Sequence, residues 1–171
     1  MLDNSTNLWY NNNVNERRYK KMEKAIYFDV DGTIANLYAV DGWLEKLRAY
    51  DATPYRNAKV MVNMAQLARV LNALQKQGYH IGIISWLSKQ PTPIYNLEVI
   101  QAKWQWLGKH LKSVHFDEVK IVAHGTPKGS VVQYPQGILF DDESGNRQAW
   151  QGQAYDEKNI LEILRKLLKN A

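Results

Sequence analysis

The chain has 171 residues, of which 45% are hydrophobic and 23% charged, so it can form one globular domain with a sizeable core. It contains no cysteine, which excludes disulfides, zinc–thiolate sites and cysteine nucleophiles. The net charge of +5 favours anionic partners such as phosphates or nucleic acid. No apolar run is long enough for a membrane span or a signal peptide, so we expect a cytoplasmic protein without membrane association.

Residues 1–23 differ in composition from the rest of the chain. They contain six asparagines and a basic cluster, and they show no apolar periodicity. We interpret them as a polar, basic N-terminal extension exposed to solvent. A basic arm that contacts nucleic acid is the alternative. Residues 24–171 are then the folded domain.

From Lys24 onward, short apolar runs alternate with segments of helical periodicity. The predicted elements, in chain order, are a strand at 25–28, a helix at 59–77, a strand at 80–84, a helix at 96–112, strands at 119–122 and 137–140, and helices at 145–151 and 157–169. This alternation predicts a Rossmann-like α/β fold, with a parallel sheet and helices on both faces.

Polar residues follow three of the predicted strands. Asp29 and Asp31 follow the first, Ser85 ends the second, and Asp141 and Asp142 follow the fourth. Because ligands of open parallel sheets bind at the carboxyl ends of the strands, we expect these side chains to converge on one crevice.

This set of residues is suited to phosphoryl transfer. Asp29 can attack phosphorus and form an aspartyl-phosphate, and Asp31 can protonate the leaving oxygen and then activate water. Clustered carboxylates repel one another unless a cation lies between them, and their hard oxygen atoms suit Mg²⁺. The metal ligands expected from these residues are Asp29, Asp141 and Asp142.

Five further residues are expected at the phosphate. Ser85 and Lys128 can hold the transferring phosphoryl group, and Gly32 lets the backbone approach the substrate. Thr33 lies beside Gly32 and is assigned to the same subsite. Trp86 follows the serine and either stacks on a base or sugar or forms a wall of the pocket.

These segments resemble the four motifs of the haloacid dehalogenase superfamily of phosphohydrolases. FDVDGT at 28–33 is similar to the first motif, IISW at 83–86 to the second, Lys128 to the third and LFDDESGN at 139–146 to the fourth. The resemblance covers residues 24–170. It implies that Asp29 is the nucleophile, that the backbone carbonyl of Asp31 also binds the metal, and that Asp141 or Asp142 completes the metal site.

Other classes fit the motifs less well. In response-regulator receiver domains the lysine comes last, whereas Lys128 precedes the last acidic pair here. The segment 125–130 is too short for the phosphate-binding loop of P-loop kinases. A non-catalytic binding module that keeps the fold remains an alternative to the enzyme.

The spacing between Asp31 and Ser85 leaves room only for a small insertion at about 36–58, in place of a large lid domain. This segment combines aromatic residues with Arg48 and Arg56, which can stack bases and pair phosphates. An apolar helix face that covers the core is the other interpretation. The layout is similar to polynucleotide 3′-phosphatase domains and small 5′(3′)-deoxyribonucleotidases. We therefore expect a nucleotide or nucleic-acid end phosphate as substrate, with a small metabolite as the alternative.

Overall fold

The structure is a computed structural model that describes residues 23–90 and 92–170. The predicted N-terminal extension therefore lies outside the described residues, apart from Glu23. Within the described ranges, no helix is both long and apolar enough to cross a bilayer.

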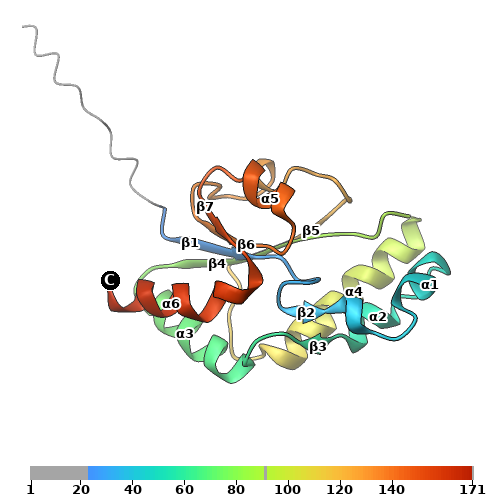
Figure 1. The fold of residues 1–171 in the computed structure, drawn as a ribbon, viewed down its shortest axis with the longest axis horizontal. Coiled ribbons are helices and arrows are strands. Elements are labelled where there is room, and N and C mark those ends of the chain that lie inside the picture. The colour runs from blue at the N-terminus through green and yellow to red at the C-terminus, as the bar shows by residue number, and fades with distance from the viewer. Residues whose placement is uncertain (1–22, 91, 171) are drawn as a thin grey trace, which may run out of the picture.

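A five-stranded parallel sheet forms the centre of the described part of the chain, in the order β5–β4–β1–β6–β7 (Figure 1). Its strands are β1 (Ala25–Phe28), β4 (His80–Trp86), β5 (Glu118–Val122), β6 (Ile138–Phe140) and β7 (Gln153–Tyr155). Each pair of neighbouring strands runs parallel. The predicted Rossmann-like α/β fold is thereby confirmed.

The central strand β1 explains why the first apolar run of the sequence is continuous. All four of its residues are buried, and Phe28 pairs with Ile83 of β4 on one side and Phe140 of β6 on the other. A parallel strand covered on both faces has apolar side chains at every position. Asp29, the first polar residue after this run, consequently lies at the carboxyl edge of the sheet.

Helices cover the two faces of the sheet unequally (Figure 1). On one face, α3 (Met64–Lys76), α6 (Ile160–Lys169) and the end of α4 (Pro93–His110) contribute to the largest hydrophobic cluster. The other face holds a smaller cluster around Tyr27 and Trp150, covered by α5 (Ser144–Ala149) and the segment 123–137. Helices thus lie on both faces, as predicted, but the second face is covered largely by irregular chain.

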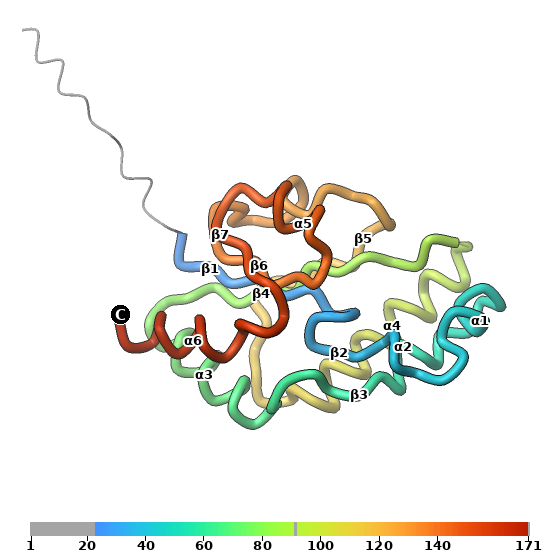
Figure 2. The backbone as a smooth tube through the Cα atoms, viewed as in Figure 1, coloured from blue at the N-terminus to red at the C-terminus, as the bar shows by residue number. Residues whose placement is uncertain are grey.

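The segment between β1 and α3 forms a small helical insertion. Its elements are β2 (Ala35–Asn36), η1 (Leu37–Ala39), α1 (Trp43–Arg48), α2 (Thr53–Asn57) and β3 (Lys59–Val60), and β2 pairs antiparallel with β3. Leu37 and Tyr55 of the insertion pack against Tyr95 and Val99 of α4. Figure 2 shows the insertion beside α4, at the end of the molecule away from α6. Two further 3₁₀ helices are η2 (Lys128–Ser130) and η3 (Glu157–Asn159).

The helix predicted at 59–77 begins later than expected. α3 starts at Met64, because the side chain of Asn63 caps it by accepting a hydrogen bond from the Gln66 backbone N–H at 3.0 Å. Val60 has helical spacing from Met64, but it lies in β3 and is 41% exposed. A local strand pairing and a cap therefore override the apolar period at this end of the helix.

One further helix boundary and one strand differ from the prediction. The helix predicted at 96–112 is α4, which begins at Pro93 because proline suits the first turn and Thr92 caps it. β7 was not predicted, since its three residues show no apolar run. Gly152 precedes it, and a Cβ atom at this position would lie 2.0 Å from the Gly137 carbonyl oxygen, so the strand can approach β6 only with glycine there.

Candidate active site

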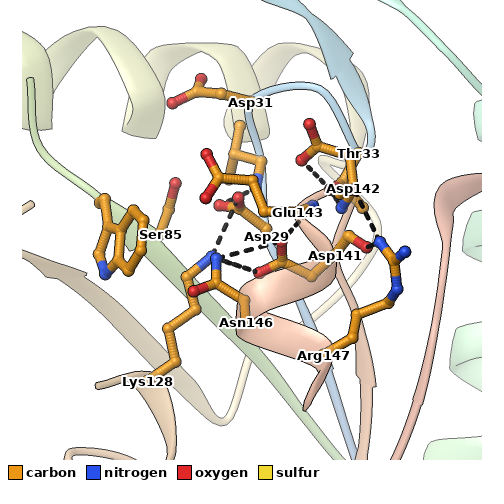
Figure 3. Close-up of polar contacts among 12 residues, drawn as sticks. Asp29, Asp31, Thr33, Ser85, Lys128, Asp141, Asp142, Glu143, Asn146 and Arg147 are labelled. Carbon is orange, nitrogen blue, oxygen red and sulfur yellow. Dashed lines mark hydrogen bonds and ion pairs between the residues drawn. The ribbon is translucent and has the colours of Figure 1, made fainter. Parts of the chain in front are cut away.

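The structure brings the predicted polar residues to one edge of the sheet. Asp29 follows β1, Asp141 follows β6, and Ser85 lies near the end of β4. The backbone N–H of Asp29 donates to the Phe140 carbonyl at 2.9 Å, so this aspartate is fixed next to the start of the fourth motif. Figure 3 shows these side chains pointing into the same region.

Lys128 lies at the centre of this cluster. Its ammonium nitrogen is 3.0 Å from Asp29 Oδ2 and 2.6 Å from Asp141 Oδ2 (Figure 3). The residue is 4% exposed and begins η2, at the end of the Gly/Pro-containing loop. Burial lowers the pKa of Lys128, but the charges of the two carboxylates outweigh this effect and raise it overall. The lysine is therefore held in its charged form.

Asp141 is buried and extensively hydrogen-bonded. Its Oδ1 accepts from the Glu143 backbone N–H at 2.9 Å, its Oδ2 accepts from Lys128, and the amide of Asn146 reaches both oxygen atoms. Burial and the charge of Asp29 raise the pKa of Asp141, while Lys128 opposes the rise. These contacts fix the orientation of this carboxylate.

Asp142 has fewer contacts than Asp141. Its Oδ1 accepts a hydrogen bond from the Thr33 hydroxyl at 3.2 Å, and its backbone N–H donates to the same hydroxyl at 3.0 Å. Burial, followed by the charges of Asp29 and Asp141, raises the pKa of Asp142 to about 7. One oxygen atom from each of these three aspartates lies within 4.8 Å of the others, an arrangement that can hold a metal ion.

Asp31 takes a different direction from the other carboxylates. Its side chain is turned away from the Asp29 carboxylate in Figure 3 and is 16% exposed. Its Oδ2 lies 2.5 Å from the ammonium nitrogen of Lys103, which comes from α4. Burial raises the pKa of Asp31, and the neighbouring Lys103 opposes that rise. Asp31 also lines the cavity beside the cluster.

Gly32 and Thr33, which were assigned to the phosphate, are engaged in internal contacts. The Gly32 backbone N–H donates to the Ala35 carbonyl at 2.8 Å, and the Thr33 side chain joins the first and fourth motifs through Asp142. Gly32 has φ +76°, and a Cβ atom there would lie 2.4 Å from Asp142 Oδ2. Glycine is therefore required by both the turn and the close approach of Asp142.

Trp86 forms part of a cavity wall. Its indole N–H donates to the Thr126 carbonyl at 2.8 Å, and Lys128 Nζ lies 5.1 Å from the centre of its ring. The adjacent cavity has a volume of ≈ 390 Å³, and Asp29 and Asp31 lie in its lining. The insertion and the β4–α4 connection supply most of the remaining lining, which includes Tyr38, Trp43, Leu44, Leu47, Arg48, Tyr55, Ser88 and Lys89.

Two groups of residues around the site were not predicted. Asn146 lies within the fourth motif without an assigned role, and Arg147 donates to the backbone carbonyls of Asp141 and Asp142, both at 2.7 Å. Lys103 lies far from every motif, but its position in the helical pattern of the sequence indicates that it is buried. With Val99 and Leu107 it forms an i, i+4, i+8 series, which places a lysine on the apolar face of a helix.

The described residues define a Rossmann-like α/β fold, with an acidic site at the carboxyl ends of parallel strands. Among solved structures, the fold is similar to D,D-heptose 1,7-bisphosphate phosphatase from Burkholderia thailandensis, with a TM-score of 0.54 and 9% identity. The match covers 85% of this chain and 99% of that chain. No protein-family profile matches this chain, and no curated protein is significantly similar in sequence.

Proposed function

We propose that this protein is a magnesium-dependent phosphomonoester hydrolase in which Asp29 is the nucleophile and Asp31 the acid/base. The observation that carries the proposal is the ammonium group of Lys128 between Asp29 and Asp141, next to Asp142. A phosphoryl group is anionic, so a carboxylate nucleophile can approach it only where positive charge offsets the repulsion. The fold shared with a phosphatase adds support.

The hydrogen bonds favour Asp29 and Asp142 as the side-chain ligands of the metal. Both oxygen atoms of Asp141 already accept hydrogen bonds, one of them from Lys128. Asp142 Oδ1 accepts from Thr33, and among the described residues its Oδ2 accepts none. In our proposal Asp141 orients Lys128, and the backbone carbonyl of Asp31 would complete the protein ligands of the metal. Bound Mg²⁺ supplies positive charge against the phosphoryl oxygens.

Hydrolysis then takes place in two displacements. A carboxylate oxygen of Asp29 attacks phosphorus, the ester P–O bond breaks, and the leaving oxygen takes the proton of Asp31. A water molecule next attacks phosphorus and gives a proton to Asp31, while the bond between Asp29 and phosphorus breaks. Inorganic phosphate is released and both aspartates return to their starting states. Ser85 and Lys128 hold the phosphoryl group during both steps.

The cavity supports a nucleotide or a nucleic-acid end as the substrate. A volume of ≈ 390 Å³ lies within the usual range for small-molecule pockets. Tyr38, Trp43 and Trp86 contribute aromatic surface to it, on which a base can stack, and Arg48 and Lys89 add positive charge. We assign these residues to the leaving group, which lies beyond the phosphate on the side of the insertion.

A phosphate-release screen with Mg²⁺ tests the function. Wild-type protein is expected to release phosphate from nucleoside monophosphates or end-phosphorylated oligonucleotides faster than from sugar phosphates. Asp29→Asn is expected to abolish release, whereas Asp41→Asn, an exposed carboxylate of the insertion, serves as the matched control and keeps activity. Release by Asp29→Asn at the wild-type rate would disprove the role of Asp29. Mg²⁺ binding without any release would favour a non-catalytic binding module.

A further inference from the structure

Lys103 is a buried lysine whose three N–H groups all have an acceptor in the site. Its side chain is 1% exposed, although α4 is otherwise an ordinary amphipathic helix in this region. The ammonium nitrogen lies 2.5 Å from Asp31 Oδ2, 2.8 Å from Ser85 Oγ and 2.6 Å from the Trp86 carbonyl oxygen. An ammonium group has three donors and no acceptor, so Lys103 is fully satisfied by these contacts.

These contacts join two parts of the site that the sheet alone does not connect. Asp31 belongs to the turn after β1, and Ser85 lies near the carboxyl end of β4. An aspartate in a turn beside three other carboxylates is driven by repulsion away from them. Lys103 gives the Asp31 side chain one definite direction, and the same ammonium group fixes the hydroxyl of the proposed phosphate-binding serine.

The insertion in turn holds Lys103 in place. The Lys103 nitrogen lies 5.1 Å from the centre of the Tyr55 ring, a favourable cation–π contact with a residue of α2. One turn along α4, the Trp106 indole N–H donates to the Ala58 carbonyl at 2.7 Å. The position of the lysine therefore depends on the packing of α4 against the insertion, which also lines the cavity.

We propose that Lys103 is a positioning residue that directs the Asp31 carboxylate towards the leaving group and holds Ser85 at the phosphate. The inference rests on the proposed hydrolase function. In the first displacement the Asp29–phosphorus bond forms, the ester P–O bond breaks and the Asp31 proton moves to the leaving oxygen. Without Lys103 the Asp31 side chain points elsewhere, and the leaving oxygen departs without that proton.

Two esters with different leaving groups separate this role from a general structural one. A nitrophenolate leaves without protonation, whereas an alkoxide requires the proton of Asp31. In Lys103→Met, kcat/KM for an alkyl phosphate such as a nucleoside 5′-monophosphate is expected to fall by about 100-fold or more, the usual effect of losing a general acid. For p-nitrophenyl phosphate the expected loss is about 10-fold smaller than for the alkyl phosphate, because its leaving group needs no proton and only the displacement of Ser85 contributes. Lys109→Met, on the exposed face of the same helix, is the matched control and keeps both activities.

A double-mutant cycle with Asp31→Asn completes the test. If Lys103 acts through Asp31, Lys103→Met in the Asp31→Asn background reduces alkyl phosphate hydrolysis no more than it reduces p-nitrophenyl phosphate hydrolysis in the wild type, because only the displacement of Ser85 remains. Lys103→Gln, which keeps a neutral donor, replaces the methionine variant if that variant does not fold. Equal losses on both esters, or additive losses in the cycle, overturn the inference. A wild-type protein inactive on both esters overturns the proposed function itself, which distinguishes the two failures.

Discussion

Mg²⁺ is expected to stabilise the folded protein more strongly at pH 8 than at pH 5. The reason is the cluster of Asp29, Asp141 and Asp142, in which burial and mutual repulsion raise the pKa of Asp142 to about 7. A raised pKa means that the folded state binds a proton more tightly than the unfolded state. The resulting stabilisation is complete below the ordinary aspartate pKa of 3.8 and is lost as the pH rises through about 7.

The size of this loss follows from the difference between the two pKa values. A rise from 3.8 to about 7 corresponds to at most about 4 kcal/mol, at ~1.4 kcal/mol for each pH unit. Because Asp142 is only partly buried, solvent screens its interactions, and between pH 5 and pH 8 we expect a loss of about 1.5 kcal/mol. For a domain of this size such a loss lowers the melting temperature by roughly 3–6 °C.

Thermal melts in EDTA and in Mg²⁺ across this pH range measure the effect. Burial lowers the pKa of His110 and His124, so their protonation destabilises the fold at acidic pH and opposes the aspartate effect. The difference between the two melts at each pH cancels the histidine contribution. Asp142→Asn should reduce both the pH dependence of the metal-free melt and the response to Mg²⁺. A Mg²⁺-induced shift that is equal at pH 5 and pH 8 would refute the reasoning.

Four further substitutions have defined outcomes. Lys128→Met removes the ammonium group between two carboxylates and should lower kcat by about 100-fold or more in phosphate-release assays, while circular dichroism shows an intact fold. Gly152→Ala places a Cβ atom 2.0 Å from the Gly137 carbonyl oxygen and should lower the free energy of unfolding, measured in urea, by about 3 kcal/mol. Gly108→Ala, with open space around it in α4, should raise the free energy of unfolding by about 0.5 kcal/mol. Tyr27→Phe removes a buried hydroxyl bonded to a carboxylate of β5 and should cost about 1–3 kcal/mol without changing turnover.

The position of the acidic cluster could be predicted because it depends on local pattern and one topological rule. The runs before Asp29 and Asp141 are apolar at every position, which is typical of strands buried on both faces. Once such strands run parallel, their carboxyl ends meet, and the residues that follow them converge. This rule does not place Lys128, because the residue lies in a loop. Its position in the chain between the second and fourth motifs led to its prediction.

Contacts between elements distant in sequence could not be predicted in this way. β2 and β3 have two residues each, and their pairing depends on the closure of the insertion, so no periodicity marks them. The three acceptors of Lys103 come from the turn after β1 and from β4, which only the folded chain brings together. The helical spacing of Lys103 indicated burial, but nothing local indicated its partners.

In the proposed mechanism, the two buried lysines give chemically identical aspartates different roles. Asp29 attacks phosphorus as a carboxylate in this mechanism, and Lys128 lies 3.0 Å from it. In the same mechanism Asp31 carries and returns a proton, so it needs a raised pKa, which burial provides, and a fixed direction, which Lys103 provides. Because Lys128 pairs with Asp29 and Lys103 pairs with Asp31, the two carboxylates do not compete for one cation. Around Lys128, one ammonium group faces the carboxylates of Asp29, Asp141 and Asp142, and a divalent ion bound beside Asp142 would offset the negative charge that remains once Asp142 is ionised.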